Sequence, residues 1–200
     1  MATTSNTPAV TEIPRINKNR FHLTIVGETP LITHKFSDTQ KKQILDKQMK
    51  KAVAARKAKD PELDYRESMY YTPDGKPGFP ASGIKGSCVA ACSFLPKSVT
   101  KVWARGAFYI VGDILPIDGE PEMREDIVRI GGRSADLRYR AMFPEWIITF
   151  KVLHNPDIIS VDGIINLVEN AGFYVGIGDW RPQKSGTYGQ FSVLKNGQAT

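Results

Sequence analysis

The residues best suited to chemistry lie in a glycine-punctuated segment near the C-terminus, Gly176–Gly189. Between its glycines the segment carries two aromatic rings and two cations, namely Trp180, Arg181, Lys184 and Tyr188. Glycine permits positive φ angles and close backbone approach, and exposed amides in such a loop can hold phosphates. Aromatic faces stack on bases, and cations follow a phosphate backbone. The segment therefore predicts a nucleic-acid-binding loop, with a glycine-rich hairpin around a structural tryptophan as the alternative.

A second candidate anion site precedes an apolar stretch in the middle of the chain. Pro80–Gly86 leads into Ser87–Leu95, whose small and apolar residues suit a helix packed closely on a sheet. Ser82 is a plausible N-cap for this helix. The backbone amides of Ser82–Gly86, with Lys85 beside them, would then form an anion site at the helix start.

A third candidate is an arginine-rich hairpin. Ile127–Ile130 and Leu137–Arg140 flank a glycine-containing turn and predict two paired strands. The hairpin and its approach carry one tyrosine among many arginines: Arg124, Arg129, Arg133, Arg138, Tyr139 and Arg140. Interleaved arginine and aromatic side chains suit phosphate clamping and base stacking. The alternative is a hairpin whose faces are merely polar.

A basic helix is predicted over Ser37–Lys59, capped by Ser37 or Asp38 and stopped at Asp60-Pro61. Beyond the cap it has one acid, Asp46, against many cations: Lys41, Lys42, Lys47, Lys50, Lys51, Arg56, Lys57 and Lys59. Like charges three and four residues apart destabilise a helix, so this imbalance favours a polyanion that completes the neutralisation. A solvated helix face is the alternative.

The elements that must position these residues alternate along the chain. Strands are predicted at Phe21–Val26, Val102–Val111, Trp146–Leu153 and Gln190–Leu194, with another short strand at 173–175. Helices are predicted at Ser87–Leu95 and from a Ser160 cap to about Gly172. Without insertions, the order is that of a ferredoxin-like or RRM-like βαββαβ core in an α+β fold.

We expect one domain over residues 15–194 with insertions at about 37–78 and 112–145, and disordered tails at 1–14 and 195–200. The chain has 200 residues, 41% of them hydrophobic, which suits a single packed core. The formal charge of +6 favours a polyanionic partner. Cys88 and Cys92, four residues apart, fit buried free thiols in a reducing compartment. We find neither a signal peptide nor a membrane span and expect a cytoplasmic protein, in a bacterium or a phage-infected cell.

The motifs at Phe79–Gly86 and at Gly176–Gly178 with Gly186–Phe191 together resemble the RAMP superfamily, the RNA-binding proteins of CRISPR systems, and in particular their crRNA-backbone subunits. Similar motifs occur in small stand-alone phage proteins. The resemblance implies an RRM-like palm with an inserted thumb or finger, copies stacked along a strand, and Lys85 and the glycine loop near the backbone of that strand. The chain departs from the family pattern at Ala81, where glycine is usual, and in its long basic helix.

Catalysis is the less favoured interpretation. Some RAMP proteins cut RNA with an aspartate or a histidine, and the candidates here are Asp60, Asp64, Asp74, His22 and His34. No nucleotide-hydrolysis, serine-hydrolase or zinc-protease motif occurs. The acidic residues of 118–126 are predicted to be solvated, and we expect no metal and no cofactor.

The sequence thus predicts a single-stranded nucleic-acid-binding protein that grips RNA or ssDNA with little sequence preference and associates with itself into a filament or stack. A RAMP-type ribonuclease and a phage assembly protein remain alternatives. The predicted binding residues are Lys50, Lys51, Ser82, Lys85, Arg133, Arg138, Arg140, Trp180, Arg181, Lys184 and Tyr188.

Overall fold

The computed structural model describes residues 12–36, 38–50, 58–130 and 134–194. Helices and antiparallel strands alternate along the chain, which confirms the predicted α+β class. The predicted C-terminal tail and most of the N-terminal one lie outside the described residues. No helix in the described ranges is long and apolar enough to cross a membrane.

The central sheet joins four strands that are far apart in sequence. They are β1 (Asn19–Gly27), β5 (Phe108–Val111), β9 (Ile147–His154) and β10 (Phe191–Val193). Their spatial order is β10-β1-β9-β5, and each neighbouring pair is antiparallel. β1 alternates as the sequence predicts, so that Leu23 and Ile25 are buried whereas His22 is exposed.

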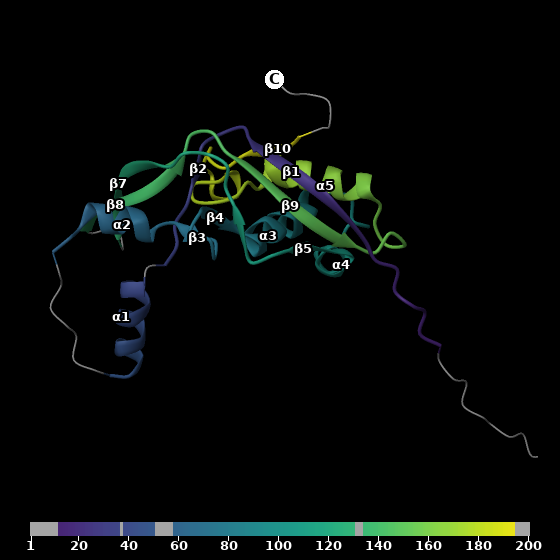
Figure 1. Ribbon diagram of the computed structural model, residues 1–200, viewed down its shortest axis with the longest axis horizontal. Coiled ribbons are helices and arrows are strands. Elements are labelled where there is room, and N and C mark those ends of the chain that lie inside the picture. Colours follow the sequence, from purple (N-terminus) through teal and green to yellow (C-terminus); the bar gives the residue numbers. More distant parts are fainter. Residues whose placement is uncertain (1–11, 37, 51–57, 131–133, 195–200) are drawn as a thin grey trace, which may run out of the picture.

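Two helices cover the buried face of this sheet, and no described helix lies on the opposite face, which we call the open face (Figure 1). They are α3 (Ala81–Ala91), between β1 and β5 in sequence, and α5 (Val161–Tyr174), between β9 and β10. The Ser160 hydroxyl accepts a hydrogen bond from the Gly163 amide, which confirms the predicted cap of α5. Because α5 continues to Tyr174, the short strand predicted over 173–175 is wrong.

The arginine-rich hairpin is present and longer than predicted. It consists of β7 (Glu122–Ile130) and β8 (Ser134–Phe143), and β2 (Leu31–Ile32) pairs with the far end of β8. Its turn, which includes Arg133, lies outside the described residues. The three strands form a second sheet in the order β2-β8-β7.

A third small sheet leads the chain into α3. It has the order β3-β4-β6, from β3 (Tyr70–Tyr71), β4 (Pro77–Pro80) and β6 (Ile114–Pro116). The stretch between β5 and β7 therefore contains the short strand β6.

The predicted continuous helix over Ser37–Lys59 is wrong. α1 (Asp38–Gln48) is followed by a turn in which Lys50 has a φ of 53°, a left-handed value that does not continue a right-handed helix. Asp60-Pro61, predicted as a stop signal, starts a second helix, α2 (Pro61–Glu67). The Asp60 carboxylate accepts a hydrogen bond from the Leu63 amide, and proline suits the first helical position.

The first half of the strand predicted over Val102–Val111 is also a helix. The Thr100 hydroxyl accepts a hydrogen bond from the Trp103 amide and caps α4 (Lys101–Ala107), so β5 begins only at Phe108. Between α3 and α4, a 3-10 turn, η1 (Cys92–Phe94), follows directly on α3. Cys88, in α3, and Cys92, at the start of η1, are buried free thiols, as predicted.

Candidate nucleic-acid interface

A groove of about 350 Å³ lies between the arginine-rich hairpin and the glycine-rich segment. Its wall combines one aliphatic, one acidic, one aromatic and several basic side chains: Val128, Arg138, Arg140, Asp179, Trp180, Arg181 and Lys184. Residues predicted separately from the hairpin and from the loop therefore meet in one place, although some 40 residues separate them along the chain. We refer to this surface as the groove.

Trp180 is held in an unusual backbone conformation. Its φ is 55°, in the left-handed region that L-residues seldom adopt, and its side chain is 49% exposed. The Tyr188 amide donates to the Trp180 carbonyl oxygen, and a Cβ at Gly186 would overlap that oxygen. Close packing of loop backbone thus fixes where the indole ring stands.

Three backbone amides of the glycine-rich loop donate hydrogen bonds to carbonyl oxygens of the protein itself. The Ile177 amide donates to Gly189 at 2.9 Å, the Asp179 amide to Ile32 at 2.9 Å and the Gly189 amide to Pro30 at 2.8 Å. The expectation that exposed amides of this loop hold phosphates is therefore wrong for these three groups. These three amides therefore do not hold a phosphate in this conformation of the loop.

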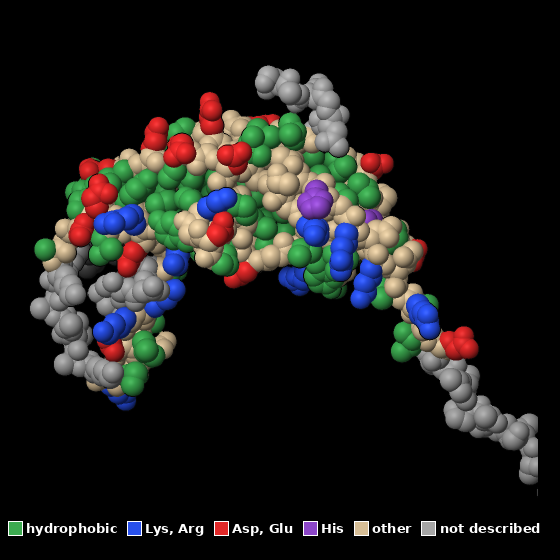
Figure 2. Space-filling view, in the orientation of Figure 1, with side chains coloured by type: hydrophobic (Ala, Val, Ile, Leu, Met, Phe, Trp, Pro, Cys, Tyr) green, Lys and Arg blue, Asp and Glu red, His purple; other side chains and the backbone are tan. Residues whose placement is uncertain are grey.

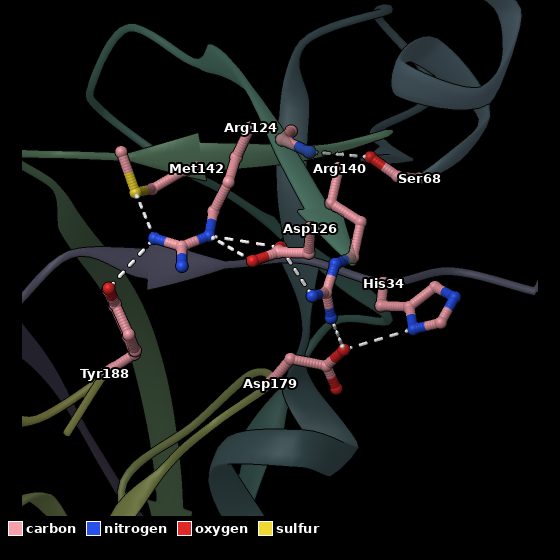
Figure 3. Close-up of polar contacts among 9 residues, drawn as sticks. His34, Ser68, Arg124, Asp126, Arg140, Met142, Asp179 and Tyr188 are labelled. Carbon is pink, nitrogen blue, oxygen red and sulfur yellow. Dashed lines mark hydrogen bonds and ion pairs between the residues drawn. The ribbon is translucent and has the colours of Figure 1, made fainter. Parts of the chain in front are cut away.

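Arg140 joins the two walls of the groove from inside. Its guanidinium lies 2.6 Å from an Asp126 carboxylate oxygen on β7 and 2.5 Å from an Asp179 oxygen in the loop. Only 4% of the side chain is exposed. Figure 3 shows the guanidinium between the two carboxylates. Arg140, predicted to contact nucleic acid, thus forms ion pairs with two acids of its own chain.

Arg124 and Tyr188 extend this network. The Arg124 guanidinium lies 2.9 Å from an Asp126 oxygen, donates to the Tyr188 hydroxyl at 2.9 Å, and stands 4.8 Å from the centre of the tyrosine ring. Tyr188, predicted as a stacking residue, is therefore a partner of Arg124 (Figure 3). The prediction that Asp126 is solvated is wrong, because its side chain is only 14% exposed and lies in ion pairs.

His34 completes the network at the other end. Its Nδ1 lies 3.1 Å from Asp179, and its ring stacks on Phe36. Burial of Asp179 favours the protonated acid, but the hydrogen bond and charge of His34 and the Arg140 guanidinium outweigh it and hold the pKa below its ordinary value. Asp179 therefore stays ionised at neutral pH, with its charge compensated.

Lys85, predicted to lie near the backbone of a bound strand, makes contacts within its own chain. Its ammonium donates to the carbonyl oxygens of Ala104 at 2.6 Å and Phe108 at 2.5 Å, and it stands 3.4 Å from the centre of the Phe108 ring. Burial lowers the pKa of Lys85 to about 8. The ammonium thus secures the C-terminal end of α4, and the residue does not line the groove.

Two further predicted residues in the described ranges, Ser82 and Lys50, do not line the groove. Ser82 is exposed in the first turn of α3, whose N-cap is Pro80, so the predicted cap is wrong. Lys50 is exposed in the turn after α1, whereas Lys51 and Arg133 lie outside the described residues. Within the described part of the chain, no group of three or more histidine, cysteine or acidic side chains could hold a metal ion.

Sequence reasoning missed Asp179 and misread Asp126, although a signal for Asp126 exists in the hairpin register. Ile130 pairs with Ser134, which places Arg124 opposite Arg140 and Asp126 opposite Arg138. Counting back from the turn would therefore have placed the acid among the arginines. Asp179 comes from a distant loop, and no local pattern connects it to β8.

No family model and no curated protein matches the chain. Among solved structures, it is similar to Cmr6 from Pyrococcus furiosus, with 11% identity and a TM-score of 0.42 over 90% of this chain and all of that one. It is also similar to a chain of the Type III-B Cmr-beta bound to cognate target RNA, with 14% identity and a TM-score of 0.45 over 87% of this chain. It spans 59% of the length of that second chain.

The two structures are named as Cmr6 and as a Cmr-beta complex, and the RAMP resemblance stated from the two sequence motifs stays an expectation beside them. The identities are low and the TM-scores are below 0.5. No residue role is therefore carried over, and the function has to be argued from the groove of this chain.

Proposed function

We propose that this protein binds single-stranded nucleic acid in the groove between β8 and the glycine-rich loop, gripping the strand with little sequence preference. The observation that carries the proposal is that Trp180, Arg138 and Lys184 line one hollow. An exposed ring offers every base a stacking face, and flanking cations contact the phosphates without reading sequence.

The ion pairs behind the groove support this assignment by removing a repulsive charge. Asp179 is the acid in the groove wall, and an unpaired carboxylate there would repel phosphate. The Arg140 guanidinium compensates that carboxylate from inside the protein, and His34 Nδ1 lies 3.1 Å from it. The remaining cations, Arg138 and Lys184, are then able to act on a ligand.

We further propose that the four-stranded sheet with α3 and α5 is the ferredoxin-like core inferred from the sequence. Its support is the strand order β10-β1-β9-β5 combined with the positions of the two helices between the strands. In this proposal the ligand is RNA or ssDNA in the cytoplasm of a bacterium or a phage-infected cell, and several copies line up along one strand.

Fluorescence anisotropy tests the groove with labelled ssRNA and ssDNA of the same mixed sequence at low salt. Trp180→Ala should weaken binding about 5- to 150-fold, because stacking on one aromatic side chain contributes about 1–3 kcal/mol per base. Tyr109→Ala is the matched control, since it removes an aromatic ring that is 57% exposed on the open face of the sheet. It should leave the affinity unchanged.

Two results would contradict the proposal. One is the absence of binding by the unsubstituted protein to both strands at low salt. The other is a loss of affinity in Tyr109→Ala as large as that in Trp180→Ala, which would move the site from the groove to the open face of the sheet.

A further inference from the structure

A second hollow of about 290 Å³ lies at the end of α5, beside β10. Acidic, polar and aromatic side chains line it: Glu28, Glu169, Asn170, Phe173, Tyr174 and Ser192. We refer to it as the recess. Among the described residues that line it, none is basic, in contrast to the groove.

An exposed aromatic cluster borders the recess. Tyr174 stacks on Phe94 with ring centres 4.7 Å apart and meets Phe173 edge-on at 4.9 Å. The exposed fractions of Phe94 and Phe173 are 56% and 63%. Contiguous exposed apolar surface with a polar rim is typical of a docking site for another polypeptide.

A segment with complementary chemistry leaves the opposite end of β1. Residues 12–18, which we call the arm, have no helix or strand structure and are exposed at every position. Ile13 and Ile16 are 89% and 64% exposed, and Arg15 and Lys18 are the cations of the arm. Figure 1 shows the arm running away from the body, and Figure 2 shows basic side chains along it.

The residue spacing in the arm places its apolar and its basic side chains on different faces. Pro14 restricts Ile13 before it to extended conformations. In a polyproline II helix, which repeats every three residues, Ile13 and Ile16 share one face while Arg15 and Lys18 share another. The arm can therefore present apolar groups to rings and cations to carboxylates at the same time.

The arm cannot fill the recess of its own chain. Glu28, in the recess wall, directly follows the nine residues of β1, so the strand separates it from the arm by about 30 Å. Ile16 lies three residues before β1, which allows a reach of about 10 Å. Ile13 and Ile16 can therefore occupy a recess together only in another copy.

We propose that the arm of one copy docks in the recess of the next, with Ile13 and Ile16 against Phe173 and Tyr174, and Arg15 beside Glu28. The two surfaces differ and lie at opposite ends of β1, so the contact is head-to-tail and leaves a free arm and a free recess at the ends of the assembly. The inference deepens the self-association in the proposed function, and it uses no groove residue.

Sedimentation velocity on the full-length protein, freed of nucleic acid by nuclease treatment, tests this contact by charge reversal. The unsubstituted protein should form oligomers that grow with concentration. Arg15→Glu and Glu28→Lys should each raise the dissociation constant about tenfold, because each brings like charges together. The double variant should return the constant to within about threefold of the original, because the pair is restored in reverse.

Ile16→Asp gives an independent measurement. It places a carboxylate between the rings and acids of the recess, so the oligomers should be lost. Because Ile16 is exposed in the arm, the fold should stay intact, which circular dichroism checks. Monomers of the unsubstituted protein at all concentrations, unchanged association in Ile16→Asp, or a double variant no better than the singles would each overturn the proposal.

A short strand separates failure of this inference from failure of the proposed function. An oligonucleotide of about four nucleotides, the lower end of the site sizes of single-strand-binding folds, has room for only one copy. Its affinity should be the same for the arm variants and the unsubstituted protein. Its failure to bind any of them would refute the groove, whereas the sedimentation result concerns only the arm and the recess.

Discussion

The groove and the recess are hollows of similar size, about 350 and 290 Å³, with opposite chemistry. The groove presents Trp180 with arginine and lysine side chains, and its one acid is held in ion pairs. The recess presents carboxylates and aromatic rings. A formal charge of +6 is therefore compatible with an acidic docking site, because the charge is distributed by region. Here the lining side chains indicate the partner, whereas the volume does not.

The two regions also differ in what holds them. Hydrogen bonds and ion pairs join three segments of the chain behind the groove, from His34 to Tyr188 (Figure 3). The recess is bordered by ring contacts within α5 and between α5 and η1. Substitutions should therefore affect stability more strongly at the groove than at the recess.

Arg140→Ala should have the largest effect. It leaves Asp126 and Asp179 without their shared partner, and removing one partner of a fully buried ion pair costs about 3–5 kcal/mol. Because Arg124 still lies beside Asp126 and Asp179 is 36% exposed, the loss should lie at or below the lower end of that range. Urea unfolding should show the loss as a lower midpoint. Arg138→Ala, two residues along the same strand and only partly buried, is the control and should cost less than about 1 kcal/mol. Equal losses in both variants would show that the ion pairs do not hold the groove.

A smaller effect is expected on the salt dependence of nucleic-acid binding. Each phosphate contact on a single strand adds about 0.7 to the slope of log affinity against log salt concentration. The combined variant Arg138→Gln, Lys184→Gln should therefore lower the slope by about 1.4 in anisotropy titrations. Glu28→Lys, in the recess, should leave it unchanged. An unaltered slope in the groove variant would remove these two cations from the binding site.

Lys85, outside both hollows, should produce the smallest effect. Burial lowers its pKa to about 8 in the folded protein, below the ordinary value of 10.5, so between these pH values the unfolded chain binds more protons. The contribution of Lys85 to stability should therefore rise as the pH increases through this window. Comparing urea midpoints of the unsubstituted protein and Lys85→Met checks this, because the methionine variant lacks the rise.

Groove binding should not change across the same pH range if Lys85 takes no part in it. A loss of affinity on raising the pH through 8 that disappears in Lys85→Met would instead return Lys85 to the interface, as the sequence first suggested. The pH dependence of binding thus shows whether Lys85 belongs to the binding site.

Sequence patterns predicted those elements whose signals are local. The alternation in β1, the serine cap of α5 and the two strands of the hairpin are each predicted from residues close together in sequence, and each prediction is confirmed. The predicted turn of the hairpin lies outside the described residues. The helix α4 was missed because Trp103 and Val102 have strand propensity, whereas the Thr100 cap and packing against α3 decide the conformation.

The sequence predicted which residue types line the candidate site better than it predicted the contacts that these residues make. Trp180, Arg138 and Lys184 were selected for their chemistry, and the fold brings them together. Arg140 was selected for the same reason, yet it is buried. The choice between ligand and internal partner depended on Asp179, which reaches β8 only through tertiary structure. Lys85 likewise lies among carbonyl groups of a helix that the sequence did not predict.

The backbone of the glycine-rich loop has a consequence for the entropy of binding. Three of its amides donate hydrogen bonds to the carbonyl oxygens of Pro30, Ile32 and Gly189, and the backbone of Trp180 has a φ of 55°. Ordering a residue costs about 1–2 kcal/mol in conformational entropy. Because folding already orders the loop, binding at Trp180 mainly lowers the conformational entropy of the strand and changes that of the protein little.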